Sequence, residues 1–476
     1  MKARGRLPGD QRLRLERIRP AQYVAPPPLR PRRQLSPPLV LIVSFLVLIG
    51  IGTLLLSLPL ANTQAAWTPL GTALFTATSA VCVTGLVVVD TGTYWSPFGH
   101  VVIMLLIQAG GFGFMTSSTL LLLLVVRRRT RLRDRVMVQE SMGGGGELGD
   151  VSGLVKRVAL FTLIAEGVGA VLLAIAFAGQ GLAPLTAAWF GGFHAISGFN
   201  NAGFDLTGQL GHASLRGFES DFLMLGSIGV LLVLGGLGYA IVEDVLRHRR
   251  WLPLALETKV VLMTTVVLIV AGGAAVAALE WANPQTLGRL PLEQRAFNAV
   301  FEAVTLRTAG FSALDTGALL QPTLFVVMAL MFIGGASGST AGGIKVNTFS
   351  VLMIAITSTA RGLPSAAAFG RRIQHTVVYR ALAVALLSIA FLFVTALALE
   401  NLSQESFVDV LFEAVSAFGT VGASRGITPE LSDLARAVII VAMFIGRLGP
   451  LTLVVALAAR QRRVSYRPAV ESIRIG

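Results

Sequence analysis

One sequence pattern recurs four times along this chain of 476 residues. Each copy begins with phenylalanine, continues through small and hydroxyl-bearing residues, and ends one residue beyond a glycine. The copies are Phe75–Leu86, Phe193–Phe204, Phe301–Phe311 and Phe412–Ala423, and the third is one residue shorter than the others. Their glycines recur roughly every 110 residues, which indicates four fused units of similar length. Four ordinary tight turns would not need a helix-forming stretch of constant length before each glycine.

Each unit also contains two apolar runs long enough to cross a bilayer, for which about 20 residues suffice. The runs are 39–60, 98–126, 154–178, 221–246, 259–279, 322–357, 377–399 and 434–459. Between the two runs of each unit lies a segment too short to cross, at 68–92, 186–208, 294–317 and 407–428. The sequence therefore predicts an all-α membrane protein of four fused membrane helix–pore loop–membrane helix repeats, with pseudo-fourfold symmetry around a central pore.

The composition excludes a water-soluble protein of this size. Only 13% of the residues are charged and 54% are hydrophobic, whereas soluble domains carry about 25% charged residues. The net charge of +14 comes from basic residues between apolar runs rather than on a folded polar surface, so nucleic acid is not a predicted partner. The single cysteine, Cys82, excludes a disulfide framework and is read as a small buried apolar residue.

Arginine clusters follow the second, fourth, sixth and eighth apolar runs. They comprise Arg127, Arg128, Arg129, Arg131, Arg133 and Arg135; Arg247, Arg249 and Arg250; Arg361, Arg371 and Arg372; and Arg460, Arg462 and Arg463. All fall on the side of the basic N-terminal segment, so we expect both termini in the cytoplasm and a multi-pass protein of the cytoplasmic (inner) membrane. The predicted divisions are a disordered basic tail at 1–38, repeats at 39–135, 136–250, 251–372 and 373–463, and a cytoplasmic C-terminal tail at 464–476.

The four loops suit a monovalent cation. A short helix that ends within the membrane directs its carbonyl end, equivalent to about half a negative charge, toward a central cavity. Removing the water around an ion costs of order 20 kcal/mol in a low-dielectric medium, so many backbone carbonyls must replace it together. The glycines permit the necessary backbone angles. The predicted ion-binding residues are Val83, Thr84, Gly85 and Leu86; Asn201, Ala202, Gly203 and Phe204; Thr308, Ala309, Gly310 and Phe311; and Thr420, Val421, Gly422 and Ala423.

The sixth apolar run is too long for one crossing, since 322–357 would extend about 54 Å as a helix against a hydrocarbon core of about 30 Å. A glycine-rich stretch at 334–345 interrupts it and is predicted to break the helix. Its residues include Gly334, Gly335, Ala336, Ser337, Gly338, Ser339, Thr340, Ala341, Gly342, Gly343 and Lys345. A flexible loop below an ion filter can block or open the path, although a plain kink for helix packing is the simpler alternative. The stretch is not a phosphate-binding loop, because Ile344 and Lys345 follow Gly343.

These motifs resemble those of the Trk/Ktr/HKT superfamily of cation transporters, over about 39–463. Thr420-Val421-Gly422 matches the channel-type filter motif most closely. In that superfamily a glycine at the marked position of all four repeats accompanies potassium selectivity, and all four are glycine here. The chain most resembles the KtrB membrane subunit, because it begins directly with the first repeat and lacks the additional N-terminal hairpin of the TrkH type.

The resemblance implies potassium uptake, with 334–345 as the gate. It also implies that Arg447 lies beside the gate, where it acts as an electrostatic barrier to cations and anchors carbonyls of the loop. The alternative for Arg447 is a structural ion pair that faces the cytoplasm. It also implies a homodimer on cytosolic nucleotide-binding regulatory subunits of the KtrA type, in contact with Arg127–Arg135 and the C-terminal tail. Those basic stretches equally suit anionic membrane lipid. No cofactor is expected in this chain; potassium is the transported ion, and its uptake is either passive or uses sodium as a coupling or activating ion.

Two other functions remain as alternatives. The first is transport of another monovalent cation, sodium or ammonium. The second is an intramembrane enzyme, which the sequence disfavours because it lacks His-Glu-x-x-His, Gly-x-Ser-x-Gly and a carboxylate pair at helical spacing within a span. We expect no enzymatic activity, and we interpret His194 as a hydrogen-bonded packing residue. Arg307 is expected to brace its pore helix, on Glu302 or Glu413.

Overall fold

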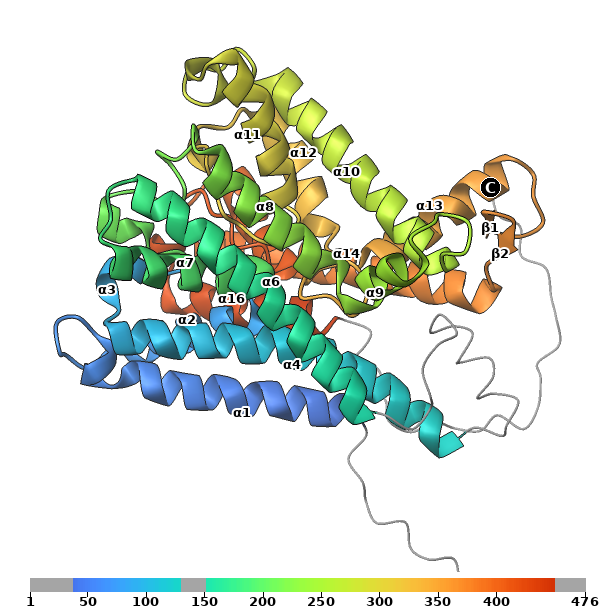
Figure 1. The fold of residues 1–476 in the computed structure, drawn as a ribbon, viewed down its shortest axis with the longest axis horizontal. Helices are drawn as coiled ribbons and strands as arrows, with labels where there is room; N and C mark the ends of the chain where they lie inside the picture. The colour runs from blue at the N-terminus through green and yellow to red at the C-terminus, as the bar shows by residue number, and fades with distance from the viewer. Residues whose placement is uncertain (1–36, 130–150, 450–476) are drawn as a thin grey trace, which may run out of the picture. The chain divides into compact units, whose positions relative to one another are not determined.

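The structure is a computed structural model that describes residues 37–129 and 151–449 (Figure 1). All of these residues belong to one compact unit. Most of the predicted tail at 1–38 and all of the tail at 464–476 lie outside the described residues. The same holds for Arg131, Arg133 and Arg135, for the end of the eighth predicted span, and for the arginines that follow it.

The described chain is almost entirely helical. Its first half contains α1 (Pro37–Ser57), α2 (Leu70–Cys82), α3 (Thr91–Tyr94), α4 (Pro97–Arg129), α6 (Val151–Gly179), α7 (Pro184–Phe199), α8 (Phe222–Leu237) and α9 (Tyr239–His248). Its second half contains α10 (Leu256–Glu280), α11 (Leu292–Thr305), α12 (Gln321–Phe332), α13 (Val346–Ala360), α14 (His375–Leu402), α15 (Phe407–Gly419) and α16 (Asp433–Leu448). Strands β1 (Ala367–Ala368) and β2 (Arg371–Arg372) form an antiparallel hairpin in which Ala367 pairs with Arg372.

Four described helices are long and apolar enough to cross a membrane. They lie within α1, α6, α10 and α14, which correspond to the first predicted span of each unit. Their outer faces carry large exposed apolar side chains, such as Leu54, Leu163, Val270 and Phe393, each more than 60% exposed. In water these faces would be large apolar patches, whereas in a bilayer they are the ordinary lipid-facing surface. The chain is therefore a multi-pass membrane protein, while the number of eight crossings and the orientation stay predictions.

The predicted fourth span, 221–246, is not one straight helix. It consists of α8 and α9, which meet at an angle of 95°. The break lies at Gly238, whose φ of +76° and ψ of 160° belong to a region that only glycine adopts readily. The predicted interruption of the sixth span is present: α12 ends at Phe332, α13 begins at Val346, and 333–345 between them is not helical.

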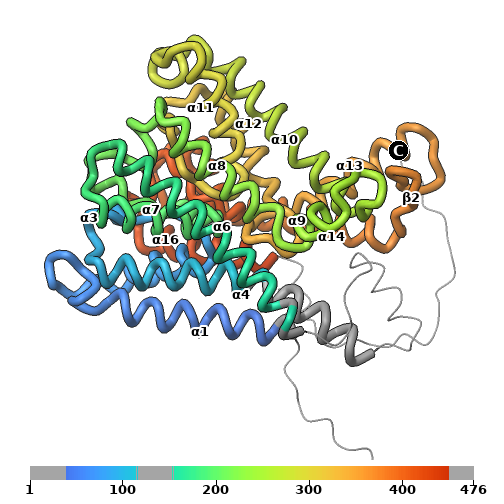
Figure 2. The backbone as a smooth tube through the Cα atoms, viewed as in Figure 1, coloured from blue at the N-terminus to red at the C-terminus, as the bar shows by residue number. Residues whose placement is uncertain are grey.

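The short helices α2, α7, α11 and α15 occupy the four segments that were predicted to be too short to cross. Each packs against long helices: α2 against α1 and α4, α7 against α6 and α8, α11 against α10 and α8, and α15 against α14 and α16. The phenylalanine that opens each sequence copy is buried in the core. The last described helix, α16, packs against α2 of the first unit, so the two ends of the chain's repeat series are in contact (Figures 1 and 2). A pseudo-fourfold axis itself stays a prediction.

Candidate functional site

The loops that follow the four short helices meet in the interior of the protein. A side chain at the glycine of each loop would overlap the carbonyl oxygen that precedes the glycine of another loop. The pairs are Gly85 with Ala202, Gly203 with Ala309, Gly310 with Val421, and Gly422 with Thr84. This series passes from the first loop through the second, third and fourth, and returns to the first. The four glycines and the four preceding carbonyls therefore form a closed ring of backbone contacts, which we call the glycine ring.

Each of these glycines has a backbone angle that other residues adopt at a cost. The values of φ are +90° at Gly85, +71° at Gly203, +67° at Gly310 and +88° at Gly422. A non-glycine residue two positions earlier also has positive φ in every loop: Val83, Asn201, Thr308 and Thr420. A positive angle costs a residue with a side chain of the order of 1–2 kcal/mol. Positive φ occurs at the same two positions in all four loops. It is therefore a shared property of the loop backbone and does not arise separately in each loop.

A hydroxyl side chain at the fifth position of each sequence copy lies beside the loop, and sequence reasoning gave it no role. Ser79 Oγ accepts a hydrogen bond from the Gly85 N–H at 3.0 Å. Ser197 and Thr305 donate to the carbonyls of Phe204 and Phe311, both at 2.7 Å. These bonds tie three of the loops to the short helices that precede them. The recurrence of Ser or Thr at one position of the repeat was the signal that could have identified them.

In three of the four units, the side chain at the second position of the sequence copy forms hydrogen bonds with the chain that follows the loop. His194 accepts from the Leu206 N–H at 3.4 Å and donates to the Phe190 carbonyl at 2.8 Å, so it is hydrogen-bonded as predicted. Glu302 accepts from the backbone N–H groups of Ala313 and Leu314 at 3.1 and 3.0 Å, and Glu413 accepts from the Thr428 hydroxyl. Each side chain thus satisfies polar groups that would otherwise be buried without partners.

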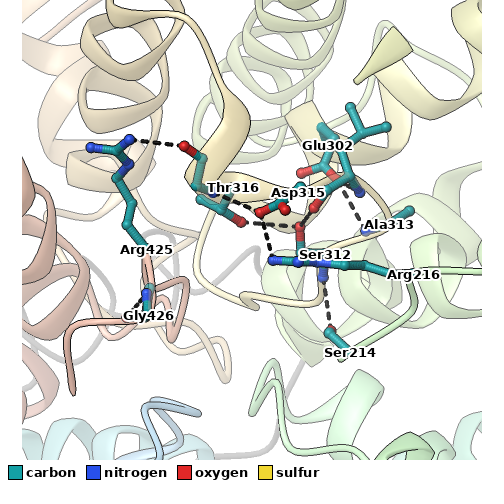
Figure 3. A network of polar contacts seen from close by, with 12 residues as sticks. Ser214, Arg216, Glu302, Ser312, Ala313, Asp315, Thr316, Arg425 and Gly426 are labelled. Carbon is teal, nitrogen blue, oxygen red and sulfur yellow. Dashed lines mark hydrogen bonds and ion pairs between the residues drawn. The ribbon is translucent and has the colours of Figure 1, made fainter. Parts of the chain in front are cut away.

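The segments beyond the loops are also joined to one another, as Figure 3 shows around Ser312 and Asp315. The bonds are Ser312 N–H to Ser214 Oγ at 3.0 Å, Arg216 Nη2 to Asp315 Oδ1 at 2.9 Å, and Arg425 Nη2 to the Gly317 carbonyl at 2.9 Å. They connect the segments that follow the second, third and fourth loops. Because both partners of the Arg216–Asp315 pair are partly exposed, that pair contributes little energy and mainly fixes the relative positions of the segments.

Asp205, directly after the second loop, is a titratable group whose pKa the fold shifts. Burial raises the pKa of its carboxyl to about 6, although hydrogen bonds from Thr207 oppose the increase. Thr207 donates through its backbone N–H at 3.1 Å and through its hydroxyl at 2.5 Å. The folded protein therefore holds a proton on Asp205 more tightly than the unfolded chain does.

The segment 333–345 is fixed to the broken end of α8 by backbone hydrogen bonds. The Ala336 N–H donates to the Gly236 carbonyl at 2.8 Å, and the Thr340 N–H donates to the Gly235 carbonyl at 3.2 Å. In a continuous helix these carbonyls would accept from residues four positions later. The break at Gly238 releases them, and the segment uses them instead. The bend in the predicted fourth span and the interruption of the sixth are thus two parts of one arrangement.

The same segment lies directly against the residues that begin three of the loops. The Thr340 hydroxyl donates to Asn201 Oδ1 at 2.8 Å. A side chain at Gly342 would overlap the Thr420 hydroxyl, and one at Gly334 would lie 3.1 Å from the Thr308 methyl group. The predicted gate and the predicted filter are therefore in contact in this structure.

Two arginines contact the segment through its carbonyl oxygens. Arg447 is fully buried and donates to the Thr340 carbonyl and, at 3.0 Å, to the Gly110 carbonyl on α4. Arg307 donates to the Gly334 carbonyl at 3.2 Å. The expectation that Arg307 braces Glu302 or Glu413 is wrong, because those carboxylates accept from groups beyond the loops, whereas Arg307 lies at the start of the third loop and reaches the neighbouring segment.

The described residues contain no group of three or more His, Cys, Asp or Glu side chains that could hold a metal ion. Cys82, at the end of α2, is fully buried, as a small apolar residue would be. Lys345 donates through Nζ to the Ala341 carbonyl within the same segment.

Comparison with known proteins identifies the family of this chain. The family model of TrkH, a cation transport protein, matches residues 28–465. The chain belongs to the TrkH family. The Ktr system potassium uptake protein B of Bacillus subtilis is 40% identical, over 90% of this chain and 95% of that protein. The potassium/sodium uptake protein NtpJ of Enterococcus hirae is 36% identical, over 94% and 99%. The resemblance to the Trk/Ktr superfamily, and to KtrB within it, is confirmed.

A solved structure supports the fold of this TrkH family member. The potassium transporter TrkH of Vibrio parahaemolyticus matches with a TM-score of 0.68, over 91% of this chain and 87% of that chain. The sequences are only 18% identical, so the match concerns the path of the backbone. The roles of individual loop residues in this chain stay predictions.

Proposed function

We propose that this chain takes up potassium across the cytoplasmic membrane through a pore at the glycine ring. One observation carries the proposal: the loops contact one another in a closed series, so that backbone carbonyls from four units converge. Such carbonyls can replace the water around an alkali ion. The names of the Bacillus subtilis and Enterococcus hirae relatives support potassium as the ion. The four repeats at 39–135, 136–250, 251–372 and 373–463 would then each contribute one loop.

The side chains at the ring fit a monovalent cation. The hydroxyls of Thr84, Thr308 and Thr420 are buried and have no hydrogen-bond partner within the described part of the chain. Buried hydroxyls normally have partners, so these oxygens are available to an ion or to the water around it. The carbonyl ends of α2, α7, α11 and α15 add partial negative charge without a fixed carboxylate in the loops. A site of this kind binds a cation and still releases it.

The segment 334–345 would act as the gate. It is in contact with the start of three loops, and its carbonyls and N–H groups are held by Arg447 and by the end of α8. Opening requires these bonds to break. At about 1 kcal/mol net for each bond, the closed position is favoured by a few kcal/mol, an amount that binding of a regulatory protein can supply.

Control by a nucleotide would come from a separate subunit. Within residues 37–129 and 151–449 the one sheet is the β1–β2 hairpin, which cannot bind a nucleotide as a βαβ unit does. We therefore propose a cytosolic regulatory subunit of the KtrA type, a homodimer of this chain, and contacts at Arg127–Arg135 and the C-terminal tail. The Ktr system protein of Bacillus subtilis carries the letter B in its name, which fits a system of more than one component.

Sodium is the second candidate ion. The Enterococcus hirae relative is named a potassium/sodium uptake protein, so a related chain of nearly the same length is associated with both ions. The glycine at all four ring positions favours potassium in this chain. Sodium as a coupling or activating ion is compatible with potassium as the main substrate.

The function is tested by rubidium uptake in a bacterial strain that lacks its own potassium transporters, with and without a coexpressed regulatory subunit. We expect uptake that excess potassium suppresses more strongly than excess sodium or ammonium. A Gly422→Asp variant, whose side chain would collide with the Thr84 carbonyl, should abolish uptake while the protein remains in the membrane. Equal suppression by sodium would favour the second candidate, and no uptake under either condition would contradict both.

A further inference from the structure

A buried carboxylate lies inside the membrane span α6, and the proposed function gives it no role so far. Glu166 is 6% exposed and occurs near the middle of that helix. None of the ion pairs formed by the described residues includes it. Carboxylates within membrane spans are costly, and where they occur they usually face the interior and serve the transported ion or its path. Glu166 therefore needs an explanation beyond packing.

Glu166 forms a network with two amide side chains from other helices. Its Oε1 accepts from Asn200 Nδ2 at 3.0 Å, and its Oε2 accepts from Gln108 Nε2 at 3.2 Å. Asn200 Nδ2 also lies 2.9 Å from both Gln108 Oε1 and the Ile196 carbonyl oxygen, so its two hydrogens are shared among three acceptors. Three elements, α4, α6 and the end of α7, thus meet at one carboxyl group.

The hydrogen bonds of the network suit the ionised form of Glu166, whereas its burial opposes ionisation. The Ile196 carbonyl can only accept, so the Asn200 atom facing it must be the NH2 group. The Gln108 atom opposite that NH2 group must then be its oxygen, which leaves the Gln108 NH2 group facing Glu166. Both carboxyl oxygens consequently face donors. A protonated carboxyl would direct its O–H at an NH2 group, which cannot accept it.

Asn200 connects this carboxylate to the glycine ring. It caps the C-terminus of α7 and immediately precedes Asn201, the residue of the second loop with a positive φ of +58°. On the opposite side, Gly111 of α4 leaves the space that Asn200 Oδ1 occupies, because a side chain there would overlap it. The Asn200 side chain is therefore clamped between α4 and α6, one residue before the predicted filter.

We propose that Glu166 is a positioning residue of the second loop that also supplies negative charge to the ion path. Through Asn200 it fixes the start of the backbone at Asn201–Gly203, and its carboxylate favours a cation at the ring. This inference rests on the proposed function. For an assumed separation of about 12 Å between the carboxylate and the cation, and an effective dielectric constant of about 20, one charge changes cation affinity about tenfold.

Two substitutions separate the charge from the positioning. E166Q retains the size of the side chain but removes the charge and one acceptor. We expect its KM for rubidium to rise about tenfold and its preference for rubidium over sodium to fall. E166D retains the charge on a shorter side chain that cannot reach Asn200 as well. Its KM should stay within about threefold of the unsubstituted chain, while its preference for rubidium over sodium falls.

E280Q is the matched control. Glu280 is a fully buried carboxylate at the end of α10, and its hydrogen-bond donors are Asn283, Thr286, Thr323 and the Leu320 N–H, none of which belongs to a predicted filter loop. Its substitution should lower the amount of folded protein without a change in KM or ion preference. All variants are compared at equal membrane content in the full chain with its regulatory subunit.

The outcomes are distinct. If the unsubstituted chain shows no potassium-suppressible rubidium uptake, the proposed function fails and this inference fails with it. If the unsubstituted chain transports but E166Q keeps the same KM and ion preference, only the inference about Glu166 is overturned. A loss of protein in E166Q that matches E280Q, with unchanged KM, would likewise reduce Glu166 to a structural residue.

Discussion

Replacement of Gly85 by serine tests the glycine ring most directly. Gly85 has φ of +90°, and a Cβ there would overlap the Ala202 carbonyl oxygen and lie 3.1 Å from the Gly203 Cα. The positive φ alone costs the folded state about 1–2 kcal/mol. Ordinary carbon–oxygen contact requires about 3.5 Å, so the Ala202 carbonyl must shift by about 1 Å. Such a shift moves an oxygen that the proposed filter uses to replace water.

We expect the Gly85→Ser variant to lose most of its discrimination between potassium and sodium. A loss of about 1.4 kcal/mol in relative binding corresponds to a tenfold fall in the ratio of the two uptake rates. The assay is rubidium uptake with potassium or sodium as competitor, normalised to the amount of protein in the membrane. Because the four ring glycines have equivalent contacts, serine at Gly310 should give a comparable fall.

Gly50→Ser is the matched control. Gly50 lies on the exposed face of α1, where an added Cβ would meet no atom within 4 Å. Serine is the better helix former of the two, so this change should leave uptake and ion preference as they are. If Gly85→Ser transported potassium with unchanged discrimination, the ring could not be the site at which ions are selected, and the reasoning from its contacts would be refuted.

Three further predictions follow from single contacts. Arg447→Gln should raise rubidium uptake in the absence of the regulatory subunit, because the Thr340 carbonyl loses its charged donor; lower uptake at equal protein content would contradict this. Gly238→Ala should lower stability by about 1–2 kcal/mol in thermal unfolding, since φ there is +76°; unchanged stability would show that the 95° bend needs no glycine. Asp205→Asn should stabilise the protein at pH 7 but not at pH 4. Because the pKa of Asp205 is raised to about 6, ionisation of its carboxyl lowers the stability of the folded protein as pH rises from about 4 to 6. The loss of stability is complete above about pH 6. We expect a gain of about 1–2 kcal/mol at this half-buried site, and equal gains at both pH values would exclude the carboxyl as the cause.

The elements that sequence reasoning predicted well are those with local causes. The first span of each unit follows from hydropathy over about 20 consecutive residues. The interruption at 334–345 follows from the poor helix propensity of a glycine-rich stretch. The glycines of the ring could be singled out because the backbone there needs positive φ, and the sequence repeats that demand four times. Each of these inferences requires only neighbours along the chain.

The errors and omissions have a common physical origin in long-range contacts. The bend at Gly238 was missed because the surrounding run is uniformly apolar, and what stabilises the bend is a set of hydrogen bonds to a segment about 100 residues later. Arg307 was assigned to a carboxylate because opposite charges attract, yet the tertiary structure gives it a carbonyl instead. Glu166 was not singled out at all, since its amide partners lie on α4 and at the end of α7.

By itself, the sequence determined that the chain contains several apolar runs long enough to cross a membrane, and that one glycine-bearing pattern recurs in it four times. Only the tertiary structure decided that each of the four glycines lies against a backbone carbonyl of another loop, which closes the ring. It also decided that the broken end of α8 holds the glycine-rich segment against that ring. The reason is that hydropathy and backbone angles are properties of adjacent residues. The pairing of a carbonyl with its donor depends instead on which helices the whole fold brings together.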